Sequence, residues 1–354
     1  MRIRYFILIF AALMAFASCG EKKKKSYDEI AMSGLTTRTE NLKTNIKAFA
    51  NKGTLIGQMY GTLSGIGWNR WECDSNRCDM KALCGYRPAA NGYELSGIES
   101  GKLQNADGVP FKTIREDVLT HFRKGGVLIM NWTMPNYNGN EDLLEEYAKQ
   151  IAKYLDTLQD GYGIKAPVIL HLLPLDGKAW YCQLGKEDYI DLYKKLQSLL
   201  EDDEVTNVVY GYSETYQPGR QLMDRYPDHH IDVINVTYYQ YKSAINLPLF
   251  QKNIQTIIAQ ALPFAQEHNN AFGLTTGIES IGDSSVFSDI LLPELKQHHI
   301  AYLMMGRNQG EPIMEHYFTP YPGVENAKVH GFMKLVNDDI TVFLEKLNGL
   351  YLEH

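Results

Sequence analysis

Eight short apolar runs alternate with longer amphipathic stretches along this chain, and no other feature of the sequence limits the fold as strongly. The runs predict strands over residues 54–59, 89–93, 126–132, 167–173, 207–212, 232–236, 272–275 and 301–305. Apolar residues at helical spacing lie between them at residues 143–158, 189–200, 247–266 and 287–297. Strands that alternate with helices are typical of parallel βαβ units, so the sequence predicts an α/β fold, a single-domain (β/α)8 TIM barrel. An open doubly wound sheet is the alternative, although no glycine-rich phosphate loop follows the first run.

The composition is that of an ordinary globular protein. Of 354 residues, 44% are hydrophobic and 22% are charged, which is enough for one large core. The net charge is −7, so the chain lacks the excess of basic residues that is typical of nucleic-acid-binding proteins, and nucleic acid is not an expected partner. The cysteine spacing does not match a zinc ribbon, and neither a metal nor another cofactor is predicted.

The N-terminus has the pattern of an export signal. Arg2 and Arg4 precede an apolar stretch at residues 5–16, and Ala17-Ser18-Cys19 then resembles a bacterial lipobox. A transmembrane anchor is the alternative, but the stretch is shorter than the roughly 20 residues that span a bilayer. We expect lipidation at Cys19 and attachment to the outer membrane of a bacterial envelope, with the surface and periplasmic faces both open. The expected segments are a signal peptide at 1–19, a tether at 20–38 and a barrel at 39–354.

Four cysteines remain after Cys19. An exported protein meets an oxidising environment, and four cysteines allow three pairings. A local bridge between Cys73 and Cys78 is the preferred expectation, and free buried thiols are the alternative. The other two cysteines are Cys84 and Cys182.

The stretch at residues 168–182, VILHLLPLDGKAWYC, is the best candidate for a site. It begins as an apolar, β-branched run and then opens into a polar loop that contains Trp180 and Tyr181. In a (β/α)8 barrel, the loops that follow the strands form the functional rim. The sequence therefore places candidate functional residues at the C-terminal ends of the strands.

This stretch resembles the fourth-strand motif of glycoside hydrolase family 26, the β-mannanase family. In that motif an Arg-Pro-aromatic-His-Glu run is followed within five residues by Trp-aromatic-Trp. An ungapped alignment places His171 at the Arg, Pro174 at the His and Leu175 at the catalytic Glu. It retains Trp180 and Tyr181 and places Cys182 at the second Trp.

Further runs resemble the same family in order, from about residue 39 to residue 344. They include CDMKALCGYRPAANGYELSGIE at 78–99, whose counterpart carries a P-A-x-x-G-x-E pattern, and GGVLIMNWT at 125–133. The others lie at residues 225–241, 289–310 and 316–323. The resemblance implies a TIM barrel and retaining glycoside hydrolysis, in which two carboxyl groups stand roughly 5 Å apart across the sugar.

The sequence departs from the family where that chemistry would occur. Leu175 stands at the position of the acid. In the seventh-strand Leu-Thr-Glu-Thr-Gly motif, the nucleophilic glutamate is either deleted or replaced by Thr276. Three more rim positions differ. Thr133 stands where the family has a histidine, Thr237 where it has an aspartate, and Gly306 where it has a tryptophan. The resemblance therefore predicts no catalytic residue at the family positions. Asp176 and Glu279 are the fallback carboxylates, and Glu214 is a further displaced one.

Aromatic and polar residues near the predicted strand ends form a candidate carbohydrate-binding surface. Aromatic rings can stack on the apolar face of a pyranose, and Tyr and Trp add a polar tip. Because side chains alternate along a strand, only one of Tyr238 and Tyr239 should face the mouth of the barrel. The alternative is that several of these aromatics plug the barrel. The candidates are Trp180, Tyr181, Tyr212, Tyr238, Tyr239, Arg307 and Asn308.

The sequence thus predicts a lipid-anchored, non-catalytic glycan-binding protein related to family 26 enzymes. The expected ligand is a β-mannan-like polysaccharide or oligosaccharide, and the expected partners are other proteins of a glycan-uptake system. One alternative is an active endo-β-mannanase or related glycosidase with relocated carboxylates. Another is a structural or partner-binding lipoprotein that uses an inherited barrel.

Overall fold

A closed parallel barrel forms the centre of the molecule. The structure is a computed structural model that describes residues 30–31, 33–73 and 76–353, so the predicted signal peptide and Cys19 lie outside the described residues. Each barrel strand pairs in parallel with its neighbour, and pairing of the first strand with the last closes the ring. The eight strands found in this part of the chain are β1 (Thr54–Met59), β4 (Ala90–Glu94), β5 (Val127–Trp132), β6 (Val168–Leu172), β7 (Val208–Thr215), β8 (Val233–Gln240), β9 (Ala271–Ile278) and β10 (Tyr302–Met305). The predicted TIM barrel is confirmed.

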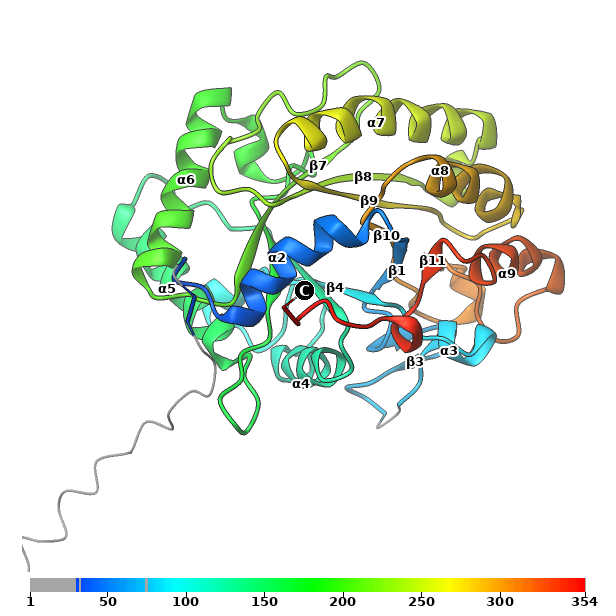
Figure 1. Ribbon diagram of the computed structural model, residues 1–354, viewed down its shortest axis with the longest axis horizontal. Helices are drawn as coiled ribbons and strands as arrows, with labels where there is room; N and C mark the ends of the chain where they lie inside the picture. The colour runs from blue at the N-terminus through cyan, green and yellow to red at the C-terminus, as the bar shows by residue number, and fades with distance from the viewer. Residues whose placement is uncertain (1–29, 32, 74–75, 354) are drawn as a thin grey trace, which may run out of the picture.

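Helices surround the barrel and follow its strands (Figure 1). Asn140 and Asn246 begin two of the long helices, where their side chains accept hydrogen bonds from the N–H groups of Leu143 and Leu249. The predicted helix at 287–297 starts instead as a π-helical turn, Val286–Leu291, because Pro293 has no N–H for a regular ladder. The helices are α2 (Thr37–Phe49), α3 (Asp79–Cys84), α4 (Phe111–Phe122), α5 (Glu141–Thr157), α6 (Lys186–Asp202), α7 (Leu247–Glu267), α8 (Leu292–Gln297) and α9 (His330–Val336). Short strands complete the elements: β2 (Ser64–Gly65), β3 (Trp68–Asn69) and β11 (Thr341–Val342).

Three strands extend three or four residues past their predicted C-terminal ends. Strands β7, β8 and β9 end at Thr215, Gln240 and Ile278, beyond the apolar runs that marked them. Polar residues such as Ser213 and Thr237 interrupt the apolar pattern there while the backbone pairing continues. These extensions carry the strands up to the rim, which is where the candidate site lies.

Along each strand, alternate side chains point into the barrel or out toward the helices, and they form an inner and an outer hydrophobic cluster. The inner cluster contains Leu55, Val127, Ile169 and Val233 and packs against helix α2 and the C-terminal segment. Figure 1 shows α2 lying across the strands with the C-terminus beside it. Because α2 and the C-terminal segment close the N-terminal end of the barrel, the opposite end is left as the functional rim.

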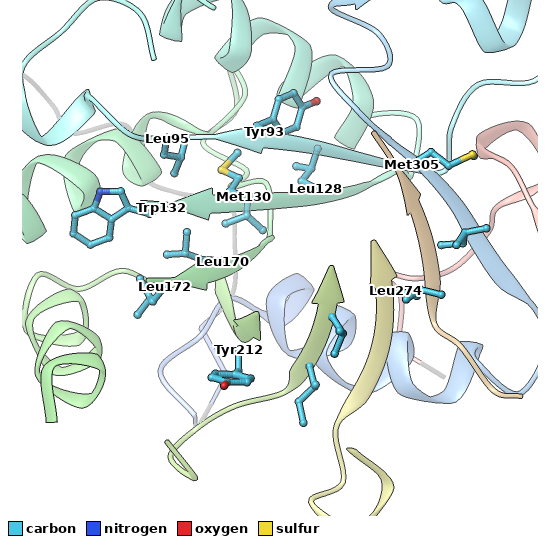
Figure 2. Packing of buried hydrophobic residues seen from close by; sticks show 14 of the residues in the cluster. Tyr93, Leu95, Leu128, Met130, Trp132, Leu170, Leu172, Tyr212, Leu274 and Met305 are labelled. Carbon is cyan, nitrogen blue, oxygen red and sulfur yellow. The ribbon is translucent and has the colours of Figure 1, made fainter. Parts of the chain in front are cut away.

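The outer cluster is the main core between the strands and the helices. Figure 2 shows outward-facing residues from successive strands, among them Tyr93, Leu128, Leu170, Tyr212 and Leu274. The strands are buried on both faces, so their sequences read as nearly continuous apolar runs.

A polar layer crosses the interior of the barrel. The Nδ1 atom of His171 lies 2.8 Å from Asn131 Oδ1, and the Tyr302 hydroxyl donates to Asn235 Oδ1 at 3.2 Å. Burial lowers the pKa of His171 to about 3, so the imidazole is neutral. Gly273 makes room for Tyr302, because a Cβ at residue 273 would overlap the tyrosine ring. His171, which the alignment placed at an arginine of the family, therefore belongs to the filling of the barrel.

The four described cysteines are free thiols, so the preferred Cys73–Cys78 bridge is wrong for this structure. Cys73 is exposed, whereas Cys78 is buried at the start of α3. Burial raises the pKa of the Cys78 thiol to about 12, which disfavours the thiolate that disulfide formation requires. Cys84 and Cys182 are half-buried. Within the described residues, no helix is both long enough and apolar enough to cross a membrane.

Candidate functional site

The C-terminal mouth of the barrel is where inward-facing strand residues become partly exposed. Met59, Glu94, Thr237, Tyr239 and Thr275 all lie at inward-facing positions and are partly exposed, while most of their neighbours are buried. Their register matches that of the inner cluster on each strand. Together they form a mostly uncharged floor of hydroxyl, amide and aromatic groups at this end.

Glu94 is the carboxylate of this floor, and the sequence analysis did not single it out. It ends strand β4, and its Oε1 atom accepts hydrogen bonds from the N–H groups of Ser96 at 3.0 Å and Thr133 at 3.2 Å. Burial raises the pKa of the Glu94 carboxyl to about 7, against the lowering effect of those backbone donors. Its signal was present in the sequence, because Glu94 is the last residue of the P-A-x-x-G-x-E pattern.

Arg307 lies beside two aromatic rings on the same rim. Its Cζ atom is 4.8 Å from the ring centroid of Tyr60 and 5.7 Å from that of Trp71, which are cation–π distances. Its Nε atom donates to Ser64 Oγ at 2.9 Å, and burial lowers the pKa of the guanidinium without discharging it. The sequence predicted Arg307 but missed both rings, which belong to the loop after β1.

Tyr60 connects Arg307 to Glu94. Its hydroxyl donates to Asp107 Oδ2 at 2.8 Å and accepts from the Glu94 N–H at 3.0 Å. The Asn105 amide donates to the same hydroxyl at 2.8 Å. The network holds the β1, β4 and β10 sides of the mouth in a fixed arrangement.

Leu175 and Thr276 both lie at the C-terminal rim and cannot exchange protons as a carboxyl group does. Leu175 continues the pairing of β6 with β7, since its N–H donates to Ser213 O at 2.9 Å and its carbonyl accepts from Thr215 N at 2.8 Å. Thr276 is fully buried and donates to Tyr238 O at 2.6 Å. The neighbouring Thr275 faces the barrel interior, where its hydroxyl donates to Asn235 Oδ1 at 2.8 Å.

The two fallback carboxylates have structural contacts. Asp176 is exposed, and its Oδ1 atom accepts hydrogen bonds from the N–H groups of Lys178 and Ala179. Glu279 is 8% exposed, with Oε1 2.6 Å from His316 Nδ1 and Oε2 accepting from Lys242 N at 3.1 Å. Asp176 thus caps a turn, and Glu279 joins two rim loops.

The predicted sugar-binding residues divide between the mouth and the core. Trp180, Tyr239 and Arg307 are partly exposed at the rim. The Trp180 indole N–H donates to Met134 O at 3.0 Å, and the Tyr239 ring lies 4.9 Å from that of Phe318. The arrangement therefore offers aromatic faces next to polar groups.

The structure does not bring the other four candidates to the mouth. Tyr212 and Tyr238 face outward, where Tyr238 packs against Phe250 of α7. Tyr181 is fully buried with its hydroxyl donating to Pro174 O at 3.2 Å. The Asn308 amide is 1% exposed and bonds the backbone of Phe318 and Thr319. Of the neighbours Tyr238 and Tyr239, only Tyr239 faces the mouth, as the alternation requires.

The free energy of unfolding should depend on pH, because burial raises the pKa of the Glu94 carboxyl group. The carboxyl has a pKa of about 7 in the folded chain and an ordinary value of 4.5, so the folded state holds the extra proton between these values. The free energy of unfolding should therefore fall as the pH rises through this window, by about 3 kcal/mol from this group. Glu94→Gln should remove that contribution, which denaturant unfolding at pH 5, 6, 7 and 8 measures.

Glu214 provides the internal control for this measurement. Burial raises its pKa to about 7 as well, and it is present in both proteins, so the difference between their pH profiles isolates Glu94. Parallel profiles for wild type and Glu94→Gln would contradict the assigned ionisation.

No group of three or more His, Cys, Asp or Glu side chains suited to a metal occurs in the described part of the chain.

Comparisons with known proteins relate this fold to β-mannanases. No protein-family model and no curated protein sequence matches the chain. A GH26 β-mannanase from Bacteroides ovatus superposes with a TM-score of 0.82 at 26% identity, over 90% of this chain and 98% of that one. The catalytic domain of a GH26 endo-β-1,4-mannanase from Bacillus sp. JAMB-750 gives 0.77 at 18% identity, over 94% and 97%.

A third similar structure carries a ligand. It is a β-mannanase from a symbiotic protist of the termite Reticulitermes speratus, complexed with gluco-manno-oligosaccharide. Its TM-score is 0.60 at 16% identity, over 88% of this chain and 94% of that one. The fold of this chain is thus that of glycoside hydrolase family 26 β-mannanases.

Proposed function

We propose that this chain, built on the fold of a family 26 β-mannanase, binds a β-mannan-like polysaccharide or oligosaccharide at the barrel mouth without cleaving it. Retaining hydrolysis needs two carboxyl groups roughly 5 Å apart. Among the inward-facing strand-end residues that the structure describes, Glu94 is the single carboxylate. Thr275 occupies the inward position on β9, and Leu175 follows β6. This depletion of carboxylates carries the proposal.

The retained surface suits a neutral glycan. Trp180 and Tyr239 present partly exposed aromatic rings, and Arg307 lies beside Tyr60 with its guanidinium still charged. Aromatic rings stack on the apolar faces of sugars while polar groups bond their hydroxyls. The similar structures are β-mannanases, which supports mannan as the first ligand to test.

Loss of the Trp180 ring should weaken glycan binding. Trp180→Ala is expected to reduce retention in a mannan-loaded affinity gel by about tenfold, equivalent to about 1.4 kcal/mol. Asp176→Asn is the matched control on the same loop, because an asparagine keeps the oxygen that caps the turn. Equal retardation of wild type and Trp180→Ala would contradict binding at this rim.

An active glycosidase with relocated carboxylates is the second candidate, and one observation favours it. The pKa of Glu94 is raised to about 7 by burial, and a general acid that operates near neutral pH needs such a value. Glu279 would then have to leave its contact with His316 to act as the partner. Reducing-end release from a β-mannan distinguishes an enzyme from a binding protein.

We also propose that the mature chain is lipid-anchored at Cys19 in a bacterial outer membrane, where it serves a glycan-uptake system. The Ala17-Ser18-Cys19 motif and the charged start support this location. The wild-type protein should partition with membranes, and Cys19→Ala should release it or leave its signal uncleaved. A wild-type protein that is wholly soluble after export would be incompatible with the anchor.

A further inference from the structure

A small, positively charged hollow lies outside the barrel, between the loop that follows β1 and helix α4. We call it the α4 hollow. Its volume of about 30 Å³ leaves room for about two water-sized groups, which suits a small ion or the terminal group of a larger molecule. The lining residues used below are Thr62, Arg70 and Arg77 from the loop, Arg87 from the segment before β4, and Asp117 and Lys124 from α4 and its C-terminal end.

Cations outnumber carboxylates in the lining of the α4 hollow. Three arginines and one lysine stand against a single carboxylate, Asp117, in a chain whose net charge is −7. The Oδ1 atom of Asp117 accepts a hydrogen bond from Arg70 Nη1 at 2.8 Å, so these two charges balance. Its Oδ2 atom accepts from the Thr62 hydroxyl at 2.6 Å. The cations that remain are Arg77, Arg87 and Lys124.

The carboxylate nearest to Arg87 is shared with a second cation. Glu345 Oε1 lies 3.2 Å from Arg87 Nη1 and 3.8 Å from Lys81 Nζ, so one negative charge serves two positive ones. Partial burial and the positive charges of Arg87 and Lys81 lower the pKa of the Lys124 ammonium group. Like charges therefore meet at this hollow without enough carboxylates to balance them.

Arg77 has an aromatic neighbour and no carboxylate partner. Its Cζ atom lies 5.6 Å from the centroid of the Trp68 ring, a cation–π contact that orients the guanidinium without neutralising it. Among the described residues, no ion pair is found for Arg77 or for Lys124. Both side chains are exposed, so a ligand can reach them from solvent.

The chemistry of these donors suits an oxoanion. A guanidinium group presents paired N–H donors that match two oxygen atoms of a phosphate, and an ammonium group adds a compact positive charge. A halide ion cannot use paired donors as two oxygen atoms do. An uncharged ligand would leave the repulsion among Arg77, Arg87 and Lys124 unrelieved.

We propose that the α4 hollow binds a phosphate group, supplied by inorganic phosphate or by the phosphate ester of a larger molecule. The proposal is independent of glycan binding, because Trp180, Tyr239 and Arg307 do not line this hollow. A bound phosphate joins the loop after β1 to α4. The same loop holds Tyr60 and Trp71 beside Arg307, so the bound group also fixes that arrangement.

Isothermal titration of the wild-type protein with sodium phosphate at pH 7 tests this site, with sodium chloride holding the ionic strength constant. Wild type is expected to show saturable binding at one site. Arg77→Gln and Lys124→Gln should each weaken it about tenfold, since each removes a charged donor from an exposed position. Arg123→Gln is the matched control, because Arg123 is exposed beside Lys124, does not line the hollow and carries the same charge. An equal loss of affinity in Arg123→Gln and Lys124→Gln would replace the site with a general electrostatic effect.

Thermal unfolding gives a second readout and does not rely on the heat of binding. Phosphate should raise the Tm of wild type more than that of Lys124→Gln, because a ligand stabilises only the protein that binds it. The general stabilisation by phosphate salts is common to both proteins and cancels in this comparison. Equal shifts in Tm, together with no saturable binding in the titration, would overturn the proposal.

Glycerol 3-phosphate and sulfate identify the source of the bound group. Tighter binding of glycerol 3-phosphate than of inorganic phosphate assigns the site to a phosphate ester, such as a lipid headgroup. Tighter binding of inorganic phosphate assigns it to the free ion. Lys124→Gln should weaken the binding of either probe. Tighter binding of sulfate than of both phosphates would overturn the assignment to phosphate.

Discussion

Purified wild-type protein is expected to release no reducing ends from a β-mannan above the background of the buffer. General acid–base help alone contributes about 10²–10⁴-fold to such reactions, and the covalent step needs a second carboxylate at close range. Leu175 has no proton to donate, and neither Thr275 nor Thr276 is a carboxylate nucleophile. The assay measures reducing ends over time, with a family 26 β-mannanase of similar structure as the positive control.

Restoring glutamates at the two family positions should not restore this activity. Thr276 faces the outer core and is fully buried, so Thr276→Glu would place a carboxylate among apolar side chains at a desolvation cost. Measurable turnover by wild type would overturn the binding-protein proposal. In that case Glu94→Gln and Glu279→Gln should each abolish the activity, since they would be the acid and its partner.

Asp117→Ala is expected to lower the free energy of unfolding by about 3–5 kcal/mol, the cost of breaking a buried ion pair. Asp117 is 2% exposed on α4, and its Oδ1 atom accepts from Arg70 at 2.8 Å. Its Oδ2 atom accepts from the hydroxyl groups of Thr62 at 2.6 Å and Tyr93 at 2.8 Å. Alanine would leave the charge of Arg70 and both hydroxyl groups without this partner.

Urea or guanidinium unfolding of the variants measures this effect. Glu116→Ala is the control on the same helix, because Glu116 is exposed and its loss should change the free energy of unfolding by less than about 0.5 kcal/mol. An Asp117→Ala protein within 1 kcal/mol of wild type would show that the network contributes little. The network also matters for the site, because Thr62 and Arg70 belong to the loop that holds Tyr60 and Trp71 beside Arg307.

Local sequence patterns were sufficient for the barrel. Most strands are runs of apolar, often β-branched residues, and such runs alternate with stretches at helical spacing that have one apolar face. The β1 strand, Thr54–Met59, was predicted to the residue, and β6 differed by one residue at each end. These properties depend on neighbours in the chain, so they can be read without knowledge of contacts.

The direction of each rim side chain could not be read in the same way. A barrel strand is buried on both faces, so its apolar pattern does not tell the inner face from the outer one. Tyr212 and Tyr239 look equally suited to a sugar in the sequence, yet Tyr212 lies in the outer core and Tyr239 at the mouth. Thr275 and Thr276 differ in the same manner.

The two strand-end glutamates show the same division most clearly. Glu94 and Glu214 each stand at or next to the end of a strand, and burial raises both pKa values to about 7. Glu94 shares the register of the inner cluster and lies at the mouth, whereas Glu214 shares that of the outer cluster and lies between the loops that follow β6 and β7. The composition and spacing of the chain were enough to make a barrel with polar residues at its rim. Which of those residues meet is set by strand register, because a shift of one residue turns a side chain to the opposite face of the sheet.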